Sequence, residues 1–212
     1  ILGRLVGSEM CIRDRNRLSR QMGESIWGNE NCPTRNRSYG PGQHGPKGVR
    51  RRSDYAFQLR EKQKLKGYYG NIGEKQFRNI FKEASSQKGD SGENLLVLLE
   101  SRLDAIVYRS NFVPTVFSAR QLVNHKHVKV NGKIVNIPSY RCKPNDEIEI
   151  KEKSRNIPLV IDSIQKLIRD VPEYLKLNQK EFKASYIRFP SSDEIPYATE
   201  MLPAAVIEYY SR

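Results

Sequence analysis

The hydrophobic period of this chain changes from about 3.6 residues to 2 close to residue 127, and this change constrains the fold most. Upstream, apolar residues recur at helical spacing. Downstream, residues 127–130 and 133–135 alternate on either side of Asn131-Gly132, a pair that suits two-residue hairpins because both turn positions need φ > 0. Residues 147–151 alternate again. Residues 90–151 therefore predict helix, helix, hairpin and strand in a compact α+β module.

The first helix of this module is expected to run from a capping box at Asp90 and Glu93 to a break at residues 111–114. Thr115 is expected to cap the second helix. Arg102 and Arg109 lie seven residues apart, which places them on one side of the first helix. The expected inward residues are Leu95, Leu96, Leu99, Leu103, Ile106 and Val107 in the first helix, and Val116, Ala119, Leu122 and Val123 in the second.

Further elements are expected on both sides of the module. Residues 29–48 are rich in Asn, Pro, Gly and Arg and predict an ordered loop or linker. Helices are expected over about 54–69, capped by Ser53 and ended by Gly70, and over about 74–87. A third helical stripe covers 160–168 and is expected to stop at Pro172. Short strands at 174–177 and 183–187, a loop at 190–203 and an apolar terminal element at 204–210 complete the prediction.

The charge of the chain indicates a polyanionic partner. Its 212 residues include 37 Lys and Arg against 24 Asp and Glu, for a net charge of +13. Residues 1–89 hold 19 basic and 8 acidic side chains, whereas residues 156–212 hold 7 and 8. A charge that served solubility alone would be spread more evenly, so nucleic acid is the favoured partner. No apolar run of about 18 residues is present, which argues against a membrane span.

Catalytic and metal-binding patterns are not evident. The chain has no phosphate-binding glycine loop, dinucleotide fingerprint or nucleophile elbow. Cys11, Cys32 and Cys142 lack the paired spacing of a structural zinc site. We therefore predict no enzyme activity, no cofactor, no metal and no small-molecule substrate. His44 lies in the Gly/Pro loop, where an RNA contact and a purely structural role are both open.

Basic and aromatic side chains supply candidate RNA contacts, because cations neutralise phosphates and both arginine and tyrosine stack on exposed bases. For Tyr69, packing is favoured over stacking, and for the arginines of the module the alternative is a surface ion pair with Asp104 or Glu100. The candidates before residue 90 are His44, Arg50, Arg51, Arg52, Tyr55, Arg60, Lys62, Lys64, Lys66, Tyr69 and Arg78. The candidates in the module are Arg102, Arg109, Arg120, Gln121, His125, Lys126, Lys129, Asn131 and Lys133.

Several motifs resemble one family. Residues 101–109 (SRLDAIVYR), 119–125 (ARQLVNH) and 128–135 (VKVNGKIV) resemble the RNA-binding module named after small-subunit ribosomal protein four. Outside the module, the sequence is similar to the bacterial form of that ribosomal protein family from about residue 16 to the end. The motifs that carry this similarity are GPGQHG at 40–45, SDY at 53–55, LREKQK at 59–64, QFRN at 76–79, GENLL at 92–96 and VIEYYSR at 206–212.

The resemblance implies an α+β protein of two domains. A mainly helical domain would cover 16–89, with the tail of about 191–212 folding back on it. An α+β domain would cover 90–190 and contain the RNA-binding module at about 101–165. Residues 1–15 do not match the family's usual start, and we interpret them as foreign. Only Cys32 matches the four-cysteine zinc knuckle of some members, so the chain resembles the zinc-free type. Val116 and Ser118 replace an Arg and a Glu that relatives often carry, which weakens the local helix cap.

The resemblance also implies a function. It implies a structural protein of the small ribosomal subunit that binds the five-prime domain of small-subunit ribosomal RNA and starts its assembly. Contacts with small-subunit protein five, a place beside the channel through which messenger RNA enters, an effect on decoding accuracy and repression of its own messenger are further implications. The location would be a cytoplasmic or organellar ribosome, with no membrane partner.

Two alternatives belong to other functional classes. One is a pseudouridine synthase that uses the same module as an accessory. That enzyme needs a further catalytic domain with an essential Asp, and no residues remain to house one. The other is a free RNA chaperone or stress factor, which would be found mainly off ribosomes.

Overall fold

The computed structural model describes residues 14–29, 31–47, 53–167 and 169–211. The chain divides into two units. One contains the chain up to Gly73 together with Tyr197 onward, and the other is Glu74–Pro196. The boundary thus lies before residue 74 and not after residue 89, because helix α3 (Glu74–Ser86) packs against α4 (Ser91–Glu100). None of the helices in the described ranges is long and apolar enough to cross a bilayer.

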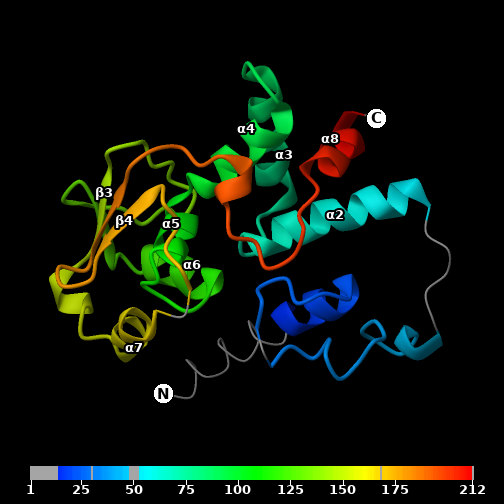
Figure 1. Ribbon diagram of the computed structural model, residues 1–212, viewed down its shortest axis with the longest axis horizontal. Helices are drawn as coiled ribbons and strands as arrows, with labels where there is room; N and C mark the ends of the chain where they lie inside the picture. The colour runs from blue at the N-terminus through cyan, green and yellow to red at the C-terminus, as the bar shows by residue number, and fades with distance from the viewer. Residues whose placement is uncertain (1–13, 30, 48–52, 168, 212) are drawn as a thin grey trace. The chain divides into compact units, whose positions relative to one another are not determined.

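The first unit is helical. It contains a helix over residues 14–22, the short 3₁₀ helix η1 (Gly45–Lys47), α2 (Asp54–Tyr68) and α8 (Pro203–Ser211). The expected cap of α2 is confirmed, because Ser53 Oγ accepts a hydrogen bond from the backbone N–H of Ala56 at 3.3 Å. Helices α2 and α8 pack side by side (Figure 1). Gln58 of α2 donates to Glu208 of α8 at 2.8 Å, so the chain's tail is part of this unit.

The second unit is α+β, as expected. After α3 and α4 come α5 (Leu103–Arg109) and α6 (Val116–Asn124), and later α7 (Pro158–Lys166). The strands are β1 (Val128–Val130), β2 (Lys133–Ile134), β3 (Glu147–Ile150), β4 (Leu175–Asn178) and β5 (Lys183–Tyr186). They form one antiparallel sheet in the order β2-β1-β3-β5-β4. Two short 3₁₀ helices, η2 (Glu152–Ser154) and η3 (Ser192–Glu194), lie in the connections.

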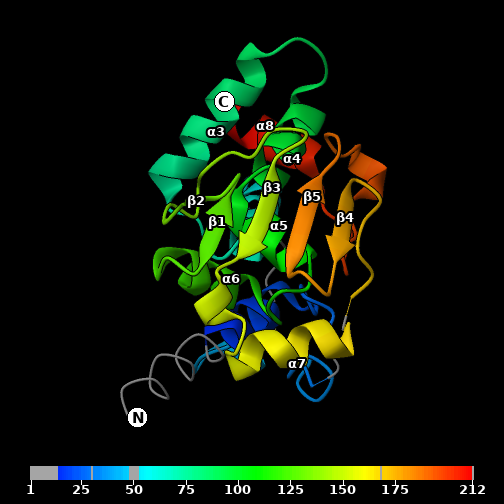
Figure 2. The ribbon, with the colours of Figure 1, turned by 90° about the vertical axis from the view of Figure 1, so that its left-hand side faces the viewer.

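One face of the sheet forms the core of this unit. Figure 2 shows the sheet from its other face, with α5 and α6 behind it. The alternation along the strands places one set of side chains on the helices, where they are buried with the apolar residues of α5, α6 and α7. This inward set includes Val128, Val130, Ile148, Ile150, Leu175, Ala184 and Tyr186.

The expected single helix from Asp90 to the 111–114 break is wrong, because it is interrupted at Ser101 and Arg102. Arg102 has extended backbone (φ −69°, ψ 142°) and forms an isolated bridge with Arg141. The neighbouring backbone groups bond to a later loop: Cys142 N–H donates to Ser101 O, and Leu103 N–H donates to Tyr140 O, each at 2.8 Å. These long-range bonds replace the helical ones, so α4 and α5 are separate helices, and Arg102 and Arg109 do not share a helix face.

The predicted turns hold in part. Asn131 and Gly132 have φ of 49° and 75°, as the expected hairpin requires, and β1 pairs with β2 across them. Thr115 caps α6 by accepting from the N–H of Ser118 at 3.1 Å, even though the reciprocal Glu is missing. The helix predicted from the apolar stripe at residues 160–168 ends earlier than expected. Helix α7 stops at Lys166, because Leu167 takes a left-handed conformation (φ 38°), well before Pro172.

Candidate nucleic-acid interface

Exposed polar and basic side chains of the second unit lie on α6 and on the first hairpin, which follow one another in the chain. Helix α6 buries its apolar face, so the opposite face points to solvent. The hairpin that follows has an exposed tip. We call this the α6–hairpin surface and define it by Arg120, Gln121, Asn124, His125, Lys126, Asn131 and Lys133, of which Arg120 is partly exposed and the others are exposed.

The backbone conformation at the end of α6 determines that His125 and Lys126 are exposed. Lys126 has a left-handed backbone (φ 62°), and its N–H donates to Val123 O at 2.9 Å. The next N–H, of His127, donates to Leu122 O at 3.2 Å. This reversal leads the chain directly into β1, and it leaves the side chains of His125 and Lys126 exposed at the end of the helix.

Hydrogen bonds between Asn131 and the segment before and at the start of β3 stabilise the hairpin tip. The side-chain amide of Asn131 donates to Asp146 Oδ1 at 2.8 Å, and its Oδ1 accepts from the N–H of Glu147 at 2.9 Å. Asn131 is therefore exposed, but its amide already serves the fold. Lys129, on β1, is half-buried, and its Nζ lies 3.2 Å from Glu149 Oε1, so its charge is partly neutralised. Lys133 remains an exposed cation at the turn.

Arg120 is connected to a buried carboxylate. Its Nε lies 3.9 Å from Asp104 Oδ2, and its side chain is 31% exposed. The same carboxylate accepts from Arg102 Nε at 2.9 Å and from Arg102 Nη2 at 2.6 Å. Burial raises the pKa of the Asp104 carboxyl, whereas the hydrogen bonds and charge of Arg102 and the charge of Arg120 oppose that shift. The sequence predicts only a surface ion pair for Asp104, and it carries no local signal for a buried carboxylate shared by two arginines.

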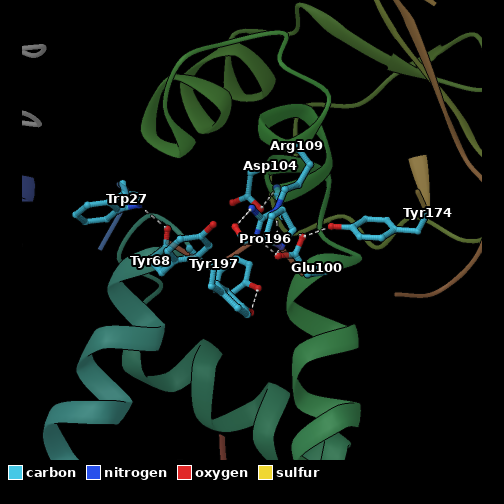
Figure 3. A network of polar contacts seen from close by, with 10 residues as sticks. Trp27, Tyr68, Glu100, Asp104, Arg109, Tyr174, Pro196 and Tyr197 are labelled. Carbon is cyan, nitrogen blue, oxygen red and sulfur yellow. Dashed lines mark hydrogen bonds and ion pairs between the residues drawn. The ribbon is translucent and has the colours of Figure 1, made fainter. Parts of the chain in front are cut away.

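Arg109 also lies inside the fold. Its Nη2 donates to Glu100 Oε1 at 2.6 Å, and its Nη1 donates to the carbonyl of Pro196 at 3.0 Å. Tyr174 donates its hydroxyl to the second oxygen of Glu100 at 3.2 Å (Figure 3). Arg102 and Arg109 are 1% and 3% exposed. The predicted RNA contacts do not fit these two arginines, because carboxylates of the same unit take up their guanidinium groups.

Three candidates in the first unit are likewise buried. Lys62 Nζ lies 4.4 Å from the centre of the Tyr209 ring, and Lys64 Nζ lies 2.8 Å from Glu24 Oε2. Tyr69 is 1% exposed, and its hydroxyl lies 2.6 Å from that of Tyr197, as packing over stacking would require. Prediction of RNA contacts at these three side chains does not fit their burial, which follows from the packing of α8 and the N-terminal segment on α2.

Other candidates remain at the surface of their own unit. His44, Tyr55 and Arg78 are exposed, and Lys66 is partly exposed. Tyr55 lies against Tyr209, with ring centres 5.6 Å apart, and so combines an exposed ring with a fixed orientation. Arg60 donates to the carbonyl of Met22 and is only partly exposed. The predictions for Arg50, Arg51 and Arg52 lie outside the described residues.

No group of three His, Cys, Asp or Glu side chains is placed to hold a metal ion in the part of the chain that the structure describes. Cys32 and Cys142 are buried free thiols. Burial raises the pKa of Cys142. Burial acts to raise the pKa of the Cys32 thiol, but hydrogen bonds from Thr34, Ser25 and Ser19 together lower it below its usual value.

Comparison with known proteins decides the family. Residues 11–100 match the family model described as the ribosomal protein S4/S9 N-terminal domain, and residues 101–148 match the S4 domain. Small ribosomal subunit protein uS4 of Bartonella quintana (strain Toulouse) is 54% identical over 196 residues, which cover 92% of this chain and 96% of the relative. The uS4 proteins of Chelativorans sp. (strain BNC1) and Maricaulis maris (strain MCS10) are each 57% identical, over 92% of this chain and 96% and 95% of theirs.

This chain belongs to the uS4 family of small ribosomal subunit proteins. The resemblance drawn from the motifs is thereby confirmed, and so is the α+β class with a helical N-terminal part and an S4 module. The uS4 family consists of ribosomal structural proteins and not of enzymes, which rules out the pseudouridine synthase alternative. The S4 match at 101–148 contains the whole α6–hairpin surface.

Proposed function

We propose that this chain binds small-subunit ribosomal RNA directly through the α6–hairpin surface. The observation that carries the proposal is the exposure of Gln121, His125, Lys126 and Lys133 on one helix end and one hairpin of the S4 module. These side chains offer two lysine cations, an amide and an imidazole, a set that suits phosphate and ribose groups. RNA helices are recognised mainly by their shape, their phosphates and their 2′-hydroxyls. The exposed lysine, amide and imidazole groups of this surface can form hydrogen bonds and ion pairs of that kind.

The first unit is proposed to contribute a second set of contacts. Residues 1–89 carry most of the chain's excess positive charge. His44, Tyr55, Arg60 and Lys66 keep some exposure, and Arg78 on α3 is an exposed cation of the second unit. Tyr55 is the candidate for base stacking, because its ring is exposed and already held by Tyr209. Arg50, Arg51 and Arg52 stay in the proposal on charge alone.

Membership of the uS4 family supports a finer role. We propose that the protein acts on the ribosome, binds at a helical junction of the five-prime domain and helps that domain assemble early. Contact with small-subunit protein five, a place beside the channel through which messenger RNA enters, an effect on decoding accuracy and repression of its own messenger belong to the same proposal. A free chaperone is the competing role, and the share of the protein that sediments with ribosomes in a sucrose gradient separates the two.

Footprinting of small-subunit ribosomal RNA with the purified protein tests the proposal. We expect protection confined to a junction of the five-prime domain at modest ionic strength. The double variant Lys126→Ala/Lys133→Ala should weaken that protection. Lys166→Ala/Lys176→Ala, which removes two exposed lysines of α7 and β4, serves as the matched control. Uniform or absent protection by the wild-type protein would refute direct, site-specific binding.

A further inference from the structure

Asp104 lies between two arginines of the second unit, Arg102 at the extended break before α5 and Arg120 on α6. It lies in the first turn of α5 and is 0% exposed. Its Oδ1 accepts from Arg102 Nε at 2.9 Å and from the backbone N–H of Ala105 at 3.0 Å. Its Oδ2 accepts from Arg102 Nη2 at 2.6 Å and lies 3.9 Å from Arg120 Nε. One carboxylate is therefore fixed by α5 and Arg102, and it attracts a third group on α6.

The two arginines differ in exposure. The Arg102 side chain is 1% exposed, so its charge stays inside the protein. The Arg120 side chain is 31% exposed and belongs to the α6–hairpin surface, although its Nε lies 3.9 Å from the buried Asp104 carboxylate. A buried carboxylate exerts a stronger field than one in water, because the surrounding dielectric is lower.

An Arg120 side chain that is already oriented in the free protein loses less conformational entropy when RNA binds. A free arginine side chain loses rotamer freedom when it is immobilised on a ligand, and that loss opposes binding. An arginine that is already oriented loses less. Because a guanidinium has five N–H donors in a rigid fork, it can face a carboxylate on one edge and a phosphate on another.

We propose that Asp104 is a positioning residue of the RNA interface, which holds Arg120 in the orientation that contacts an RNA phosphate while Asp104 itself touches no RNA. The proposal rests on the proposed function, since it assigns a role inside the same surface. For the loss of the Asp104 charge, this positioning role predicts a change in RNA affinity opposite in sign to the change that electrostatic repulsion alone predicts. Removing a negative charge near a phosphate-binding surface should strengthen RNA binding, whereas removing a positioning group should weaken it.

Binding of the full chain to a five-prime domain RNA fragment, measured over a series of salt concentrations, separates the two effects. For Asp104→Asn we expect roughly tenfold weaker binding, the size of one lost charge-assisted hydrogen bond. The slope of log K against log salt should fall by about 0.7–0.9, as for one lost phosphate contact. Asp162→Asn is the matched control, because it removes one exposed carboxylate of α7 and changes the net charge equally.

A cycle with Arg120→Ala tests whether Asp104 acts through Arg120. In the Arg120→Ala background, Asp104→Asn should cause no further loss of affinity. An equal loss in both backgrounds, or tighter binding by Asp104→Asn alone, would overturn the positioning role while wild-type binding leaves the proposed function standing. Because Asp104→Asn leaves Arg102 buried and unpaired, the variant Arg102→Gln/Asp104→Asn is made as well. It removes both buried charges, keeps the net charge constant and should show the same loss of affinity and slope.

The orientation of Arg120 can also be tested in the free protein, without RNA. In the wild-type protein, NMR relaxation of the Arg120 Nε–H group should report a rigid side chain, and the exposed Arg78 of α3 provides the mobile reference. Equal mobility of Arg120 and Arg78 would overturn the proposal. A rigid Arg120 in a protein that fails to bind RNA would instead leave the positioning intact and refute the proposed function.

Discussion

Arg109 and Glu100 form a buried ion pair that joins the end of α5 to the end of α4. Arg109 Nη2 lies 2.6 Å from Glu100 Oε1, and both side chains are at most 3% exposed. Tyr174 and the carbonyl of Pro196 complete the hydrogen bonding of the two groups. The pair is therefore well satisfied, and removing one member leaves the other charged and buried.

Glu100→Gln should destabilise the protein strongly. The guanidinium of Arg109 would lose its counter-charge in a desolvated site, a change that typically costs about 3–5 kcal/mol. Urea unfolding followed by circular dichroism measures the loss of unfolding free energy. Glu152→Gln, at an exposed position of η2, is the control and should remain within about 0.5 kcal/mol of wild type. Equal stability of the two variants would contradict the importance of this pair.

Substitutions at the hairpin tip should destabilise the second unit. Gly132→Val places a β-branched residue at φ 75°, and Asn131→Ala loses two hydrogen bonds to residues 146 and 147 as well as a side chain tolerant of φ 49°. We expect a loss of about 1–3 kcal/mol for each variant, measured from the urea unfolding midpoint. Gly40→Ala serves as control, because a Cβ there meets nothing within 4 Å. Unchanged midpoints for both tip variants would argue against this turn.

The stability of the protein should fall between pH 10 and 12 in a manner that depends on Tyr186. Burial raises the pKa of its hydroxyl from 10.0 to about 12 in the folded state, and the neighbouring Ser101 hydroxyl opposes the shift. The unfolded chain releases this proton near pH 10, so the stabilisation is complete below that pH and is lost as the pH rises toward 12. Denaturant unfolding at stepped pH measures the effect. Tyr186→Phe should flatten the slope over this range, whereas Tyr140→Phe should retain it.

The salt dependence of RNA binding should distinguish surface cations from buried ones. Lys126→Ala and Lys133→Ala should each lower the slope of log K against log salt by about 0.7–0.9, because each removes one proposed phosphate contact. Lys62→Met removes a cation that lies on the Tyr209 ring, so it should lower stability and leave the slope unchanged. Filter binding at five salt concentrations measures all three variants. A lower slope for Lys62→Met would show that the first unit opens to expose this lysine on RNA.

Local patterns predicted the elements whose signals lie within a few residues. Ser53 and Thr115 cap their helices as expected, and the Asn131-Gly132 pair forms the hairpin turn. The family motifs likewise lie in short segments, so the class and the family could be predicted from the sequence. The exposure of Lys126 and Lys133 could also be anticipated, because Lys126 lies just after the end of α6 and Lys133 lies directly after the hairpin turn.

Distant contacts decided the remainder. Nothing near Arg102 in the chain indicates that residues 140–142 interrupt its helix, and nothing near Lys62 indicates that Tyr209 will cover it. A charged side chain at a helical position has the same local pattern whether water or a buried carboxylate receives it. The sequence alone therefore determined the class, the local elements and the excess of cations. Tertiary structure determined which cations reach solvent, because the packing of distant segments decides which charged side chains are buried with a partner and which stay exposed.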